Sequence, residues 1–425
     1  MTVIKLDHIT KIYGHANLRL KIDKGKVSKA EMNIFESARF FEAILKGRKY
    51  SDAAMLTSRI CGICSSAHTL AALKAVENAF GIQPNDYTVD LRKLLQLGGI
   101  IQSHALHMYF MALPDYLGLQ DAVELAKKDP AKIDAALKLK KTGNDLVRVI
   151  GARAIHPVTP RIGGFSSVPS RSQLQEIRYG LQEARDIAVD TCVLFGDLYE
   201  TFKFKRFTQY VCLADPLEYA FYDGELCSSE AKTCTGDYRQ YIKESIRPYA
   251  TSKFALFNGK HYALGPLARI NLQKSKLNKT ALSFAKRFPA HSPFSANLAR
   301  AVEVLHCIEE AIDLLDTLDY SQAKAALKTP EIKPAKTQRG VGVIEAPRGT
   351  LFHDYQINEK GLITKANVIT PTAQFLGNVE EDVKLMVPPL LEGSKDELIQ
   401  KLEVLVRSYD PCISCATHFL DVTID

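Results

Sequence analysis

Two Cys-x-x-Cys pairs stand near opposite ends of the 425-residue chain, at Cys61–Cys64 and at Cys412–Cys415. Within each pair the two thiols lie about one turn apart, so four thiolates can converge on one metal ion. The fold must then bring the end of the chain back beside a segment near its start. We therefore expect a single intertwined fold over residues 1–418.

Each pair also has a histidine nearby. His68 follows Cys64 at i+4 and His418 follows Cys415 at i+3, which places each histidine on the face of its own pair. The spacing leaves three kinds of site open. A structural zinc site would hold the two chain ends together, but zinc knuckles mostly pair within ~20 residues of each other. A catalytic metal with soft ligands fits the wide separation better, and a thioredoxin-like redox pair fits least well.

The other five cysteines show no comparable pattern. Because the segment that opens the chain is too polar for a secretory signal, we expect a cytoplasmic protein with free thiols. Cys192 and Cys307 lie in apolar helical stretches and are predicted to be core residues. Cys212 has no assigned role, and Cys227 and Cys234, seven residues apart in a polar stretch, are not predicted to bind a ligand.

The composition excludes several classes of protein. A content of 46% hydrophobic and 24% charged residues is typical of a folded globular chain. The net charge of +7 comes from 55 basic and 48 acidic residues spread along the sequence, which gives no support to nucleic-acid binding. The most apolar stretch, Leu94 to Leu113, contains glutamines and histidines, so we expect a buried helix and no membrane span.

The hydrophobic pattern predicts a mainly α protein with two small β regions, of the α+β class, built around a central helical bundle. Alternation over residues 18–34 predicts a β-hairpin that turns at Asp23-Lys24-Gly25-Lys26. A helix is expected from Ser65 to Phe80, ending at Gly81. Further helices are expected at about 89–113, 130–152, 170–202, 294–318 and 395–407, and a second β region at 340–370.

These elements divide the chain into a series of segments. We expect a β-rich segment at 1–38, a helical core at 39–202, a mixed α+β stretch at 203–290, a helix at 291–327, a β region at 340–372, and the C-terminal helix with the second cysteine pair at 390–418. Residues 419–425 form a short tail beyond this pair.

At this point the sequence resembles the large, catalytic subunit of nickel-iron hydrogenases, and within them the cytoplasmic branch that works with NADP, F420 or heterodisulfide-reductase partners. The resemblance covers essentially the whole chain, and the motifs fall in the family's order. They are RFFEAILKGR (39–48), RICGICSSAH (59–68), SHALHMY (103–109), EAPRG (345–349), ITPT (369–372) and DPCISCATH (410–418).

The resemblance implies a role for each cysteine of the two pairs. Cys61 and Cys412 would be terminal ligands of nickel, while Cys64 and Cys415 would bridge nickel to an iron that carries carbonyl and cyanide ligands. The terminal thiolate of Cys412 would accept the proton when H2 is cleaved heterolytically. Soft thiolates suit nickel, which agrees with this ligand set.

The resemblance also implies supporting residues. Arg348 would be a fixed cation over the site, and Thr372 would donate a hydrogen bond to a cyanide. His68 would hydrogen-bond a bridging thiolate. Glu42 and His418 would bind a Mg²⁺ or Fe²⁺ ion below the cluster. Alone, Arg348 is typical of a salt bridge, Thr372 of a turn and Glu42 of a solvated helix face.

Three more histidines, His104, His107 and His156, match positions of the family. Buried structural histidines explain them at least as well.

The N-terminal motif departs from the family. It reads Lys11-Ile12-Tyr13-Gly14-His15, where the family has R-I-E-G-H with a glutamate that takes protons from the terminal cysteine. Tyr13 has an ordinary pKa near 10, so it is a poorer proton carrier at neutral pH than a carboxylate. Glu36 is an alternative carrier. We therefore predict slower or differently routed proton transfer.

The resemblance implies an obligate small subunit with iron-sulfur clusters, further electron-transfer subunits, H2 as substrate, nickel chaperones, and a maturation protease that would remove Phe419 to Asp425. The chain has neither a ferredoxin-type cysteine run nor a G-x-G-x-x-G fingerprint, so electrons must leave through that partner. Two alternatives stay open: a hydrogen-sensing or low-turnover relative, and a zinc-clasped structural subunit.

Overall fold

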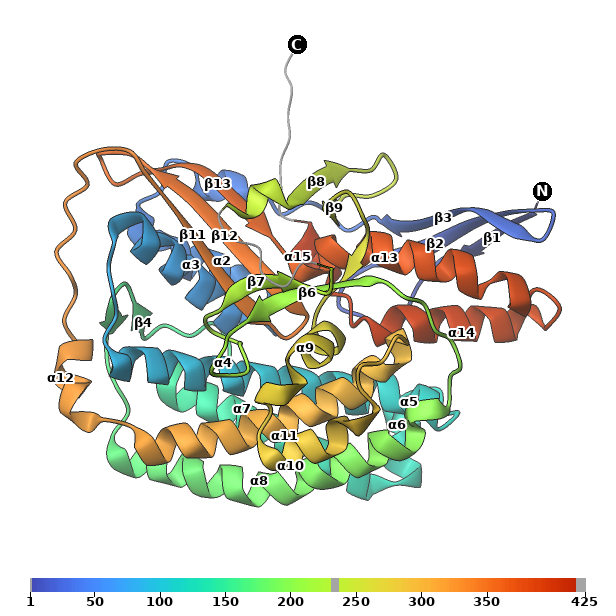
Figure 1. Ribbon diagram of the computed structural model, residues 1–425, viewed down its shortest axis with the longest axis horizontal. Helices are drawn as coiled ribbons and strands as arrows, with labels where there is room; N and C mark the ends of the chain where they lie inside the picture. The colour runs from blue at the N-terminus through green and yellow to red at the C-terminus, as the bar shows by residue number, and fades with distance from the viewer. Residues whose placement is uncertain (1, 231–236, 418–425) are drawn as a thin grey trace, which may run out of the picture.

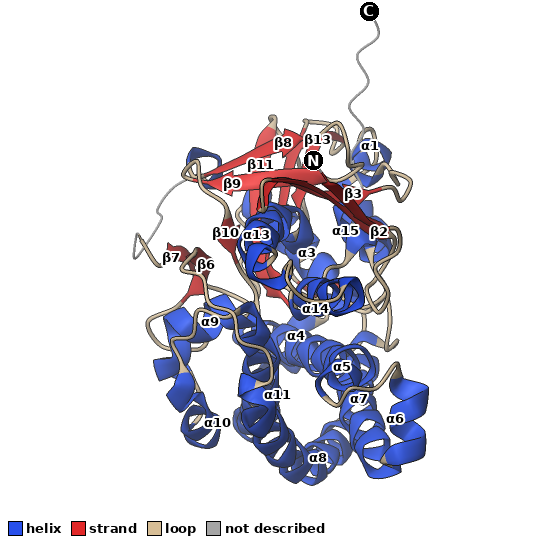
Figure 2. Cartoon of the chain, turned by 90° about the vertical axis from the view of Figure 1, so that its right-hand side faces the viewer, coloured by secondary structure: helices blue, strands red, loops and turns tan. Residues whose placement is uncertain are grey.

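The computed structural model describes residues 2–230 and 237–417. Four long helices form one half of the molecule (Figures 1 and 2). They are α4 (Asp86–Leu106), α7 (Pro130–Gly151), α8 (Arg171–Asp197) and α11 (Ala296–Thr317). Helix α4 packs against α7 and α11, and α8 packs against α7 and α11. The predicted helical bundle is therefore confirmed.

Side-chain caps define where several of these helices begin. The side chain of Asn85 accepts a hydrogen bond from the amide of Thr88, so α4 starts three residues before the predicted position. At α8, Ser170 and Gln173 cap each other's backbone amides in a reciprocal capping box. The polar residue that precedes each apolar run thus sets the start of the helix.

The predicted helix over 89–113 is not α-helical throughout. A π-helical turn follows α4 at His107–Ala112 and leads into α5 (Leu113–Tyr116). Pro114 lies just beyond this turn and has no amide hydrogen to donate to the helical ladder. Such π turns are often found where a helix aims side chains at a functional site.

The N-terminal sheet has the order β1-β2-β3 and is antiparallel. Its strands are β1 (Thr2–Leu6), β2 (Ala16–Asp23) and β3 (Lys26–Ile34). The predicted hairpin is confirmed. Lys24 and Gly25 both have positive φ, at 48° and 75°, as a tight two-residue turn requires. Strand β1 extends the hairpin to three strands, and the sheet packs on α13 (Pro371–Met386).

A second antiparallel sheet has the order β11-β12-β13, and its strands are Gln338–Ala346, Gly349–Ile357 and Ile363–Ile369. It packs on α3 (Ser65–Phe80). Gly340 and Gly342 make this close approach feasible, because a Cβ on either glycine would lie 2.0 Å from a carbonyl oxygen of α3. The sheet and the helix of the first cysteine pair are thereby held together.

The stretch at 203–290 contains short strands and helices, as the mixed pattern predicts. The remaining elements are α1 (Phe41–Leu45), α2 (Ala53–Thr57), α6 (Ala122–Lys128), β4 (Pro160–Arg161), β5 (Gly164–Phe165), β6 (Gln209–Ala214), β7 (Glu225–Ser228), β8 (Ile242–Ile246), β9 (Lys253–Phe257), β10 (Tyr262–Ala263), α9 (Pro266–Gln273), α10 (Lys279–Phe284), α12 (Ala323–Ala326), α14 (Lys395–Ser408) and α15 (Ile413–Ala416).

Two large apolar clusters form the core. One fills the helical half, and the other lies under the sheets and against α13 and α14. The four paired cysteines belong to the first cluster, whereas Ile413, between the last two of them, belongs to the second. The cysteine pairs therefore meet at the boundary of the two clusters. No helix within the described residues is both long and apolar enough to cross a membrane.

Candidate metal centre

The two Cys-x-x-Cys pairs meet at the ends of two helices. Cys64 is the N-cap residue of α3, and Cys61 follows the short helical turn Ser58–Ile60. Cys412 is the N-cap residue of α15, which contains Cys415. Two helix N-termini therefore bring the cysteines of the two pairs to one place.

The four thiols form one buried cluster. Sγ of Cys61 lies 3.6 Å from Sγ of Cys412, and Sγ of Cys64 lies 3.7 Å from Sγ of Cys415. The Cys412 and Cys415 sulfurs are 2.7 Å apart. All four residues are at most 7% exposed. Each sulfur thus faces one from the other pair, in a space that a soft metal centre can occupy.

The thiols differ in acidity. The hydrogen bond from the Cys412 thiol lowers the pKa of Cys61 well below its ordinary value. Burial instead raises the pKa of the Cys415 thiol well above its ordinary value. Because metal ligation needs thiolates, loading this cluster would release protons from the less acidic thiols.

The N-terminal segment holds Cys412 from both sides. The amide of Tyr13 donates to the carbonyl of Pro411 over 3.3 Å, and the carbonyl of Tyr13 accepts from the amide of Ile413 over 2.7 Å. The phenol oxygen of Tyr13 is buried and has no hydrogen-bond partner among the described residues. Burial raises the pKa of this phenol far above its usual value near 10. Tyr13 is therefore neutral at physiological pH.

Arg348 lies at the tip of the β11–β12 hairpin. Its guanidinium is 4.6 Å from the centroid of the Tyr13 ring. Its Nε and Nη2 donate to the carbonyl oxygen and to Oδ1 of Asp410 over 2.7 and 2.9 Å. Although burial raises the pKa of Asp410, Arg348 holds it well below its usual value. His107, the first residue of the π turn, lies 3.0 Å from the same carboxylate oxygen.

The Nη1 group of Arg348 is buried and has no hydrogen-bond partner within residues 2–230 and 237–417. Both N–H groups of Nη1 are therefore unused among the described residues.

Thr372 is the second residue of α13 and is buried. Its hydroxyl accepts a hydrogen bond from the amide of Cys412 over 3.0 Å. A hydroxyl that accepts one bond still has its own hydrogen to donate. Thr372 is thus placed both to orient Cys412 and to donate to a ligand of the centre.

His68 lies one turn into α3, with its side chain buried. Its Nδ1 is 3.0 Å from Nε2 of His353, a β12 residue whose other nitrogen bonds the hydroxyl of Tyr355. His353 was not predicted from the sequence. Its partner lies 285 residues away, and the cysteine spacing gives no sign of it.

Arg39 connects the two cysteine pairs, a role that was not predicted either. Its Nη2 donates to the carbonyl of Ile60, before the first pair, and to that of Ser414, inside the second. Its amide donates to the carbonyl of Thr417 over 2.7 Å. Arg39 is the first residue of the RFFEAILKGR motif. Its place in a family motif was the only sign in the sequence that this arginine has a special role.

Glu36 lies beside the second pair. Its carboxylate accepts from the Ser414 hydroxyl over 2.7 Å and from the His15 amide over 3.2 Å. The structure thus places Glu36 near the cluster, next to the segment that contains Tyr13.

Glu42 is on α1. Its Oε1 accepts from the amide of Val368 over 2.8 Å and from the ammonium of Lys253 over 3.0 Å. Lys253 also lies 3.3 Å from Glu244. His418 and the tail after it lie outside the described residues. The described residues thus place two carboxylates, Glu42 and Glu244, around one lysine.

The remaining predicted residues are buried or structural. His104 bonds Glu303 over 2.8 Å, and the half-buried His156 bonds the carbonyl of Ser58 over 2.8 Å. Cys192 and Cys307 are buried, which confirms the prediction of core residues. Cys212 and Cys227 face each other across β6 and β7, and Cys234 lies outside the described residues.

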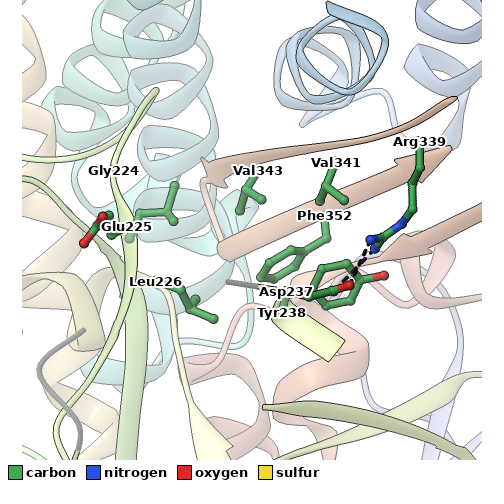
Figure 3. A pocket seen from close by; sticks show the side chains of 10 residues that line it. Gly224, Glu225, Leu226, Asp237, Tyr238, Arg339, Val341, Val343 and Phe352 are labelled. Carbon is green, nitrogen blue, oxygen red and sulfur yellow. Dashed lines mark hydrogen bonds and ion pairs between the residues drawn. The ribbon is translucent and has the colours of Figure 1, made fainter. Parts of the chain in front are cut away.

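A cavity of about 500 Å³ lies between β7 and the β11–β12 hairpin (Figure 3). Its walls include Leu226, Val343 and Phe352, and Asp237 bonds Arg339 at its rim. The residues that line it include none of the paired cysteines. This cavity is therefore separate from the thiol cluster.

The sequence matches a family model described as nickel-dependent hydrogenase over residues 39–149 and 182–418. It is 34% identical over 421 residues to the alpha chain of sulfhydrogenase 1 of Pyrococcus furiosus, covering 98% of this chain and 97% of that one. It is 31% identical to a chain of the F420-non-reducing hydrogenase of Methanothermobacter marburgensis, covering 99% and 96% of the two chains.

Among solved structures, a chain of an NAD+-reducing NiFe-hydrogenase in the H2-reduced state superposes with a TM-score of 0.89 at 28% identity, covering 98% of this chain and 100% of that one. A chain of the NiFeSe-hydrogenase of Dm. baculatum has a TM-score of 0.81 at 22% identity and shares the fold.

Proposed function

Since this chain belongs to the nickel-dependent hydrogenase family, we propose that Cys61, Cys64, Cys412 and Cys415 hold its nickel-iron centre. The chain is the catalytic large subunit of a hydrogenase, an oxidoreductase that acts on H2. Cys61 and Cys412 would bind nickel alone, and Cys64 and Cys415 would bridge nickel and iron.

The convergence of four buried thiols from the two ends of the chain carries this proposal. Sulfur donors, burial and an unpaired Arg348 donor beside the cluster all fit a nickel-iron centre with small anionic ligands on iron. We propose cyanide as the anionic ligand and carbonyl as a neutral ligand beside it, with Arg348 and Thr372 as the donors to cyanide.

When bound, the nickel-iron centre supplies the Lewis acidity and the redox capacity for heterolytic cleavage of H2. The sulfur of Cys412 would accept the proton. The amide of Tyr13 donates to Pro411 and its carbonyl accepts from Ile413, the two neighbours of Cys412, while the Cys412 amide donates to Thr372. These bonds hold the backbone of Cys412 in position. Arg348, held by Asp410, would stabilise negative charge beside it.

Tyr13 would act as a hydrogen-bond donor to the centre. Its hydroxyl lies close enough to the thiols for their charges to affect it, and it has no partner among the residues described. His68 would orient a bridging thiolate, with His353 fixing the imidazole. No described protein group lies within hydrogen-bond distance of the Tyr13 hydroxyl, which supports the predicted change of proton route.

A Mg²⁺ or Fe²⁺ ion at Glu42 is a further proposal. Glu42 is the one described donor of the expected set, and its Oε1 already has two hydrogen-bond donors. The residues described thus fit a divalent ion poorly, and we derive no step that uses one.

As a hydrogenase large subunit, the chain pairs with a small subunit. We propose that this partner carries iron-sulfur clusters and passes electrons to further subunits. We also propose a cytoplasmic location, loading by nickel chaperones, and removal of residues 419–425 by a maturation protease.

The test is metal analysis with infrared spectroscopy on the complex purified anaerobically. Nickel, iron, and carbonyl and cyanide bands are expected, together with H2-dependent reduction of a dye. Cys61→Ser should remove nickel and activity, whereas Cys192→Ser, a matched change of a buried cysteine outside the cluster, should retain both.

Zinc without these bands would contradict the proposed centre and support a structural clasp. A complete centre with little H2 turnover would instead indicate a hydrogen-sensing or low-turnover relative.

A further inference from the structure

A second cavity, of about 30 Å³, is lined by residues from the start of α9, the start of α11 and the end of α14. Among the described residues, its lining includes Arg206, Arg300 and Arg348 but no aspartate or glutamate. None of the paired cysteines lines it either. This arginine cavity therefore has cationic side chains in its wall, and it is separate from the thiol cluster.

Arg300 is the arginine of this cavity that bonds neutral groups alone. It is 1% exposed, so its guanidinium is removed from water. Its Nη1 donates to Oδ1 of Asn297 over 2.8 Å, and its Nη2 donates to the carbonyl oxygen of Ser408 over 2.9 Å. A buried charge without a partner of opposite sign is costly, because neutral acceptors replace only part of the lost hydration.

The carboxylates nearby are bonded to other cations. Oδ1 of Asp410 accepts from Arg348, and both oxygens of Glu303, three residues after Arg300 on α11, accept from Arg269. Although burial lowers the pKa of Arg269, Glu303 raises it well above its ordinary value. Burial instead lowers the pKa of Arg300 to about 10. The charge of Arg300 is therefore the less compensated of the two.

The Nε of Arg300 is buried and has no hydrogen-bond partner among the described residues. Native proteins satisfy nearly all such donors, with protein groups, water or a ligand. A water molecule would accept this hydrogen bond but would leave the charge uncompensated. An anion would satisfy both the donor and the charge, and hydrogen bonds between ionised groups are the stronger ones.

Two helix N-termini add positive potential to the arginine cavity. Helix α9 starts at Pro266 after the N-cap Gly265, and α11 starts at Ala296 after the N-cap Ser295. Neither N-cap residue forms a side-chain cap. Pro266 and Ala296 both line the cavity. Since helix N-termini favour negative charge, they act in the same direction as Arg300.

The size and the walls of the cavity limit which anion can bind. A buried water needs roughly 10–15 Å³ of such volume, so the cavity has room for an ion of one or a few atoms. Its walls include Leu264, Leu267 and Pro293, whose side chains donate no hydrogen bond. An oxyanion needs donors for several oxygens, whereas a halide needs few donors and tolerates apolar neighbours. The walls therefore favour a halide.

We propose that the arginine cavity binds one halide ion, chloride under ordinary conditions, at the Nε of Arg300. The ion supplies the negative charge that Arg300 lacks, while Asp410 stays bonded to Arg348. Binding needs neither a metal nor H2. The proposal therefore goes beyond the hydrogenase function and does not depend on it.

The first test is anomalous diffraction from crystals of the purified complex, grown with bromide as the halide. A bromine peak in contact with Nε of Arg300 is expected. Ordered water or a protein group at this place, without a bromine peak, would overturn the proposal.

The second test measures binding in solution by differential scanning calorimetry of the full chain. Sodium bromide is compared with sodium gluconate at equal ionic strength, because gluconate is too large for the cavity. For 425 residues, bromide at about 100 times its dissociation constant should raise the melting temperature by about 3 °C. Arg300→Gln removes the guanidinium and should lose this gain.

Arg178→Gln is the matched control. It removes the same charge on α8, from a residue that pairs with Asp316 and does not line the arginine cavity. This variant should keep the gain of the unmodified chain, and the comparison cancels the general effect of each salt on stability. Equal gains in all three proteins would contradict the proposal. If Arg300→Gln does not fold, the diffraction test on the unmodified complex decides.

Discussion

Replacing Asp410 by asparagine tests how far the buried charges hold the thiol cluster together. Asp410 is 2% exposed and is the carboxylate partner of Arg348 beside Cys412. Asparagine keeps the shape and can still accept a hydrogen bond. It also tolerates the positive φ of 53° at this position better than most residues do. The change therefore removes charge with little effect on the backbone.

The loss of stability in Asp410→Asn comes from the buried guanidinium of Arg348, which then lacks a charged partner. Removing one partner of a buried ion pair costs about 3–5 kcal/mol, and the retained hydrogen bond favours the lower end, about 3 kcal/mol. Unfolding entropy of about 2.1 cal/mol/K per residue gives about 0.9 kcal/mol/K for 425 residues. Asp410→Asn should thus lower the melting temperature by about 3 °C.

The assay is differential scanning calorimetry of the chain produced without nickel, so that metal binding does not contribute to stability. Asp316→Asn is the control, since Asp316 also pairs with an arginine, Arg178, but in contact with solvent. Exposed ion pairs add little stability, so Asp316→Asn should have the same melting temperature as the unmodified chain. If the two variants have the same melting temperature, the ion pair between Arg348 and Asp410 does not stabilise the folded chain, contrary to this prediction.

Three further predictions concern the site and its surroundings. Thr372→Val leaves the buried amide of Cys412 without its acceptor, so nickel content should fall in metal analysis while Thr372→Ser retains it. Tyr13→Glu places a carboxylate beside the terminal thiol and should raise the D2–water exchange rate; an unchanged or lower rate would count against the importance of this position. Burial lowers the pKa of His104 and of His306 to about 4, from 6.5 when unfolded. Between pH 4 and pH 6.5 the unfolded chain then binds more protons than the folded chain. The free energy of unfolding should therefore fall by about 3 kcal/mol per histidine as the pH drops from 6.5 to 4. In denaturant titrations, replacement of either histidine by glutamine should reduce this pH dependence.

Local pattern was enough to predict the long helices and the hairpins. Their apolar spacing, caps and turn residues act over a few positions, as at Asn85 and at Lys24-Gly25. The meeting of the four paired thiols was also predictable, because Cys-x-x-Cys spacing is a strong signal and the motifs occur in the order of a known family. The π turn at His107 was not predicted, because apolar spacing does not distinguish one π turn from the α-helix that it continues.

The residues around the thiols were harder to predict. Arg39 reaches a carbonyl 375 residues away, and His353 reaches His68 over 285 residues. One sequence contains no signal for such pairs, because each residue alone is compatible with many surroundings. Glu42 shows a different limit. Its role as a metal ligand stays a prediction from its motif, while its ion pair with Lys253 was not predictable, because no local pattern gives the position of Lys253 in space.

The separation of the two cysteine pairs has a consequence for how the protein is made. Cys61 and Cys412 are 351 residues apart. At roughly 5–20 residues per second, a ribosome needs roughly 20–70 s to pass from the first pair to the second. Throughout that interval the first two thiols lack the partners that bury them, so a newly made chain is exposed to oxidation and to capture of the wrong metal. Anaerobic growth or a protecting factor during translation should therefore matter more for yield than protection of the finished fold.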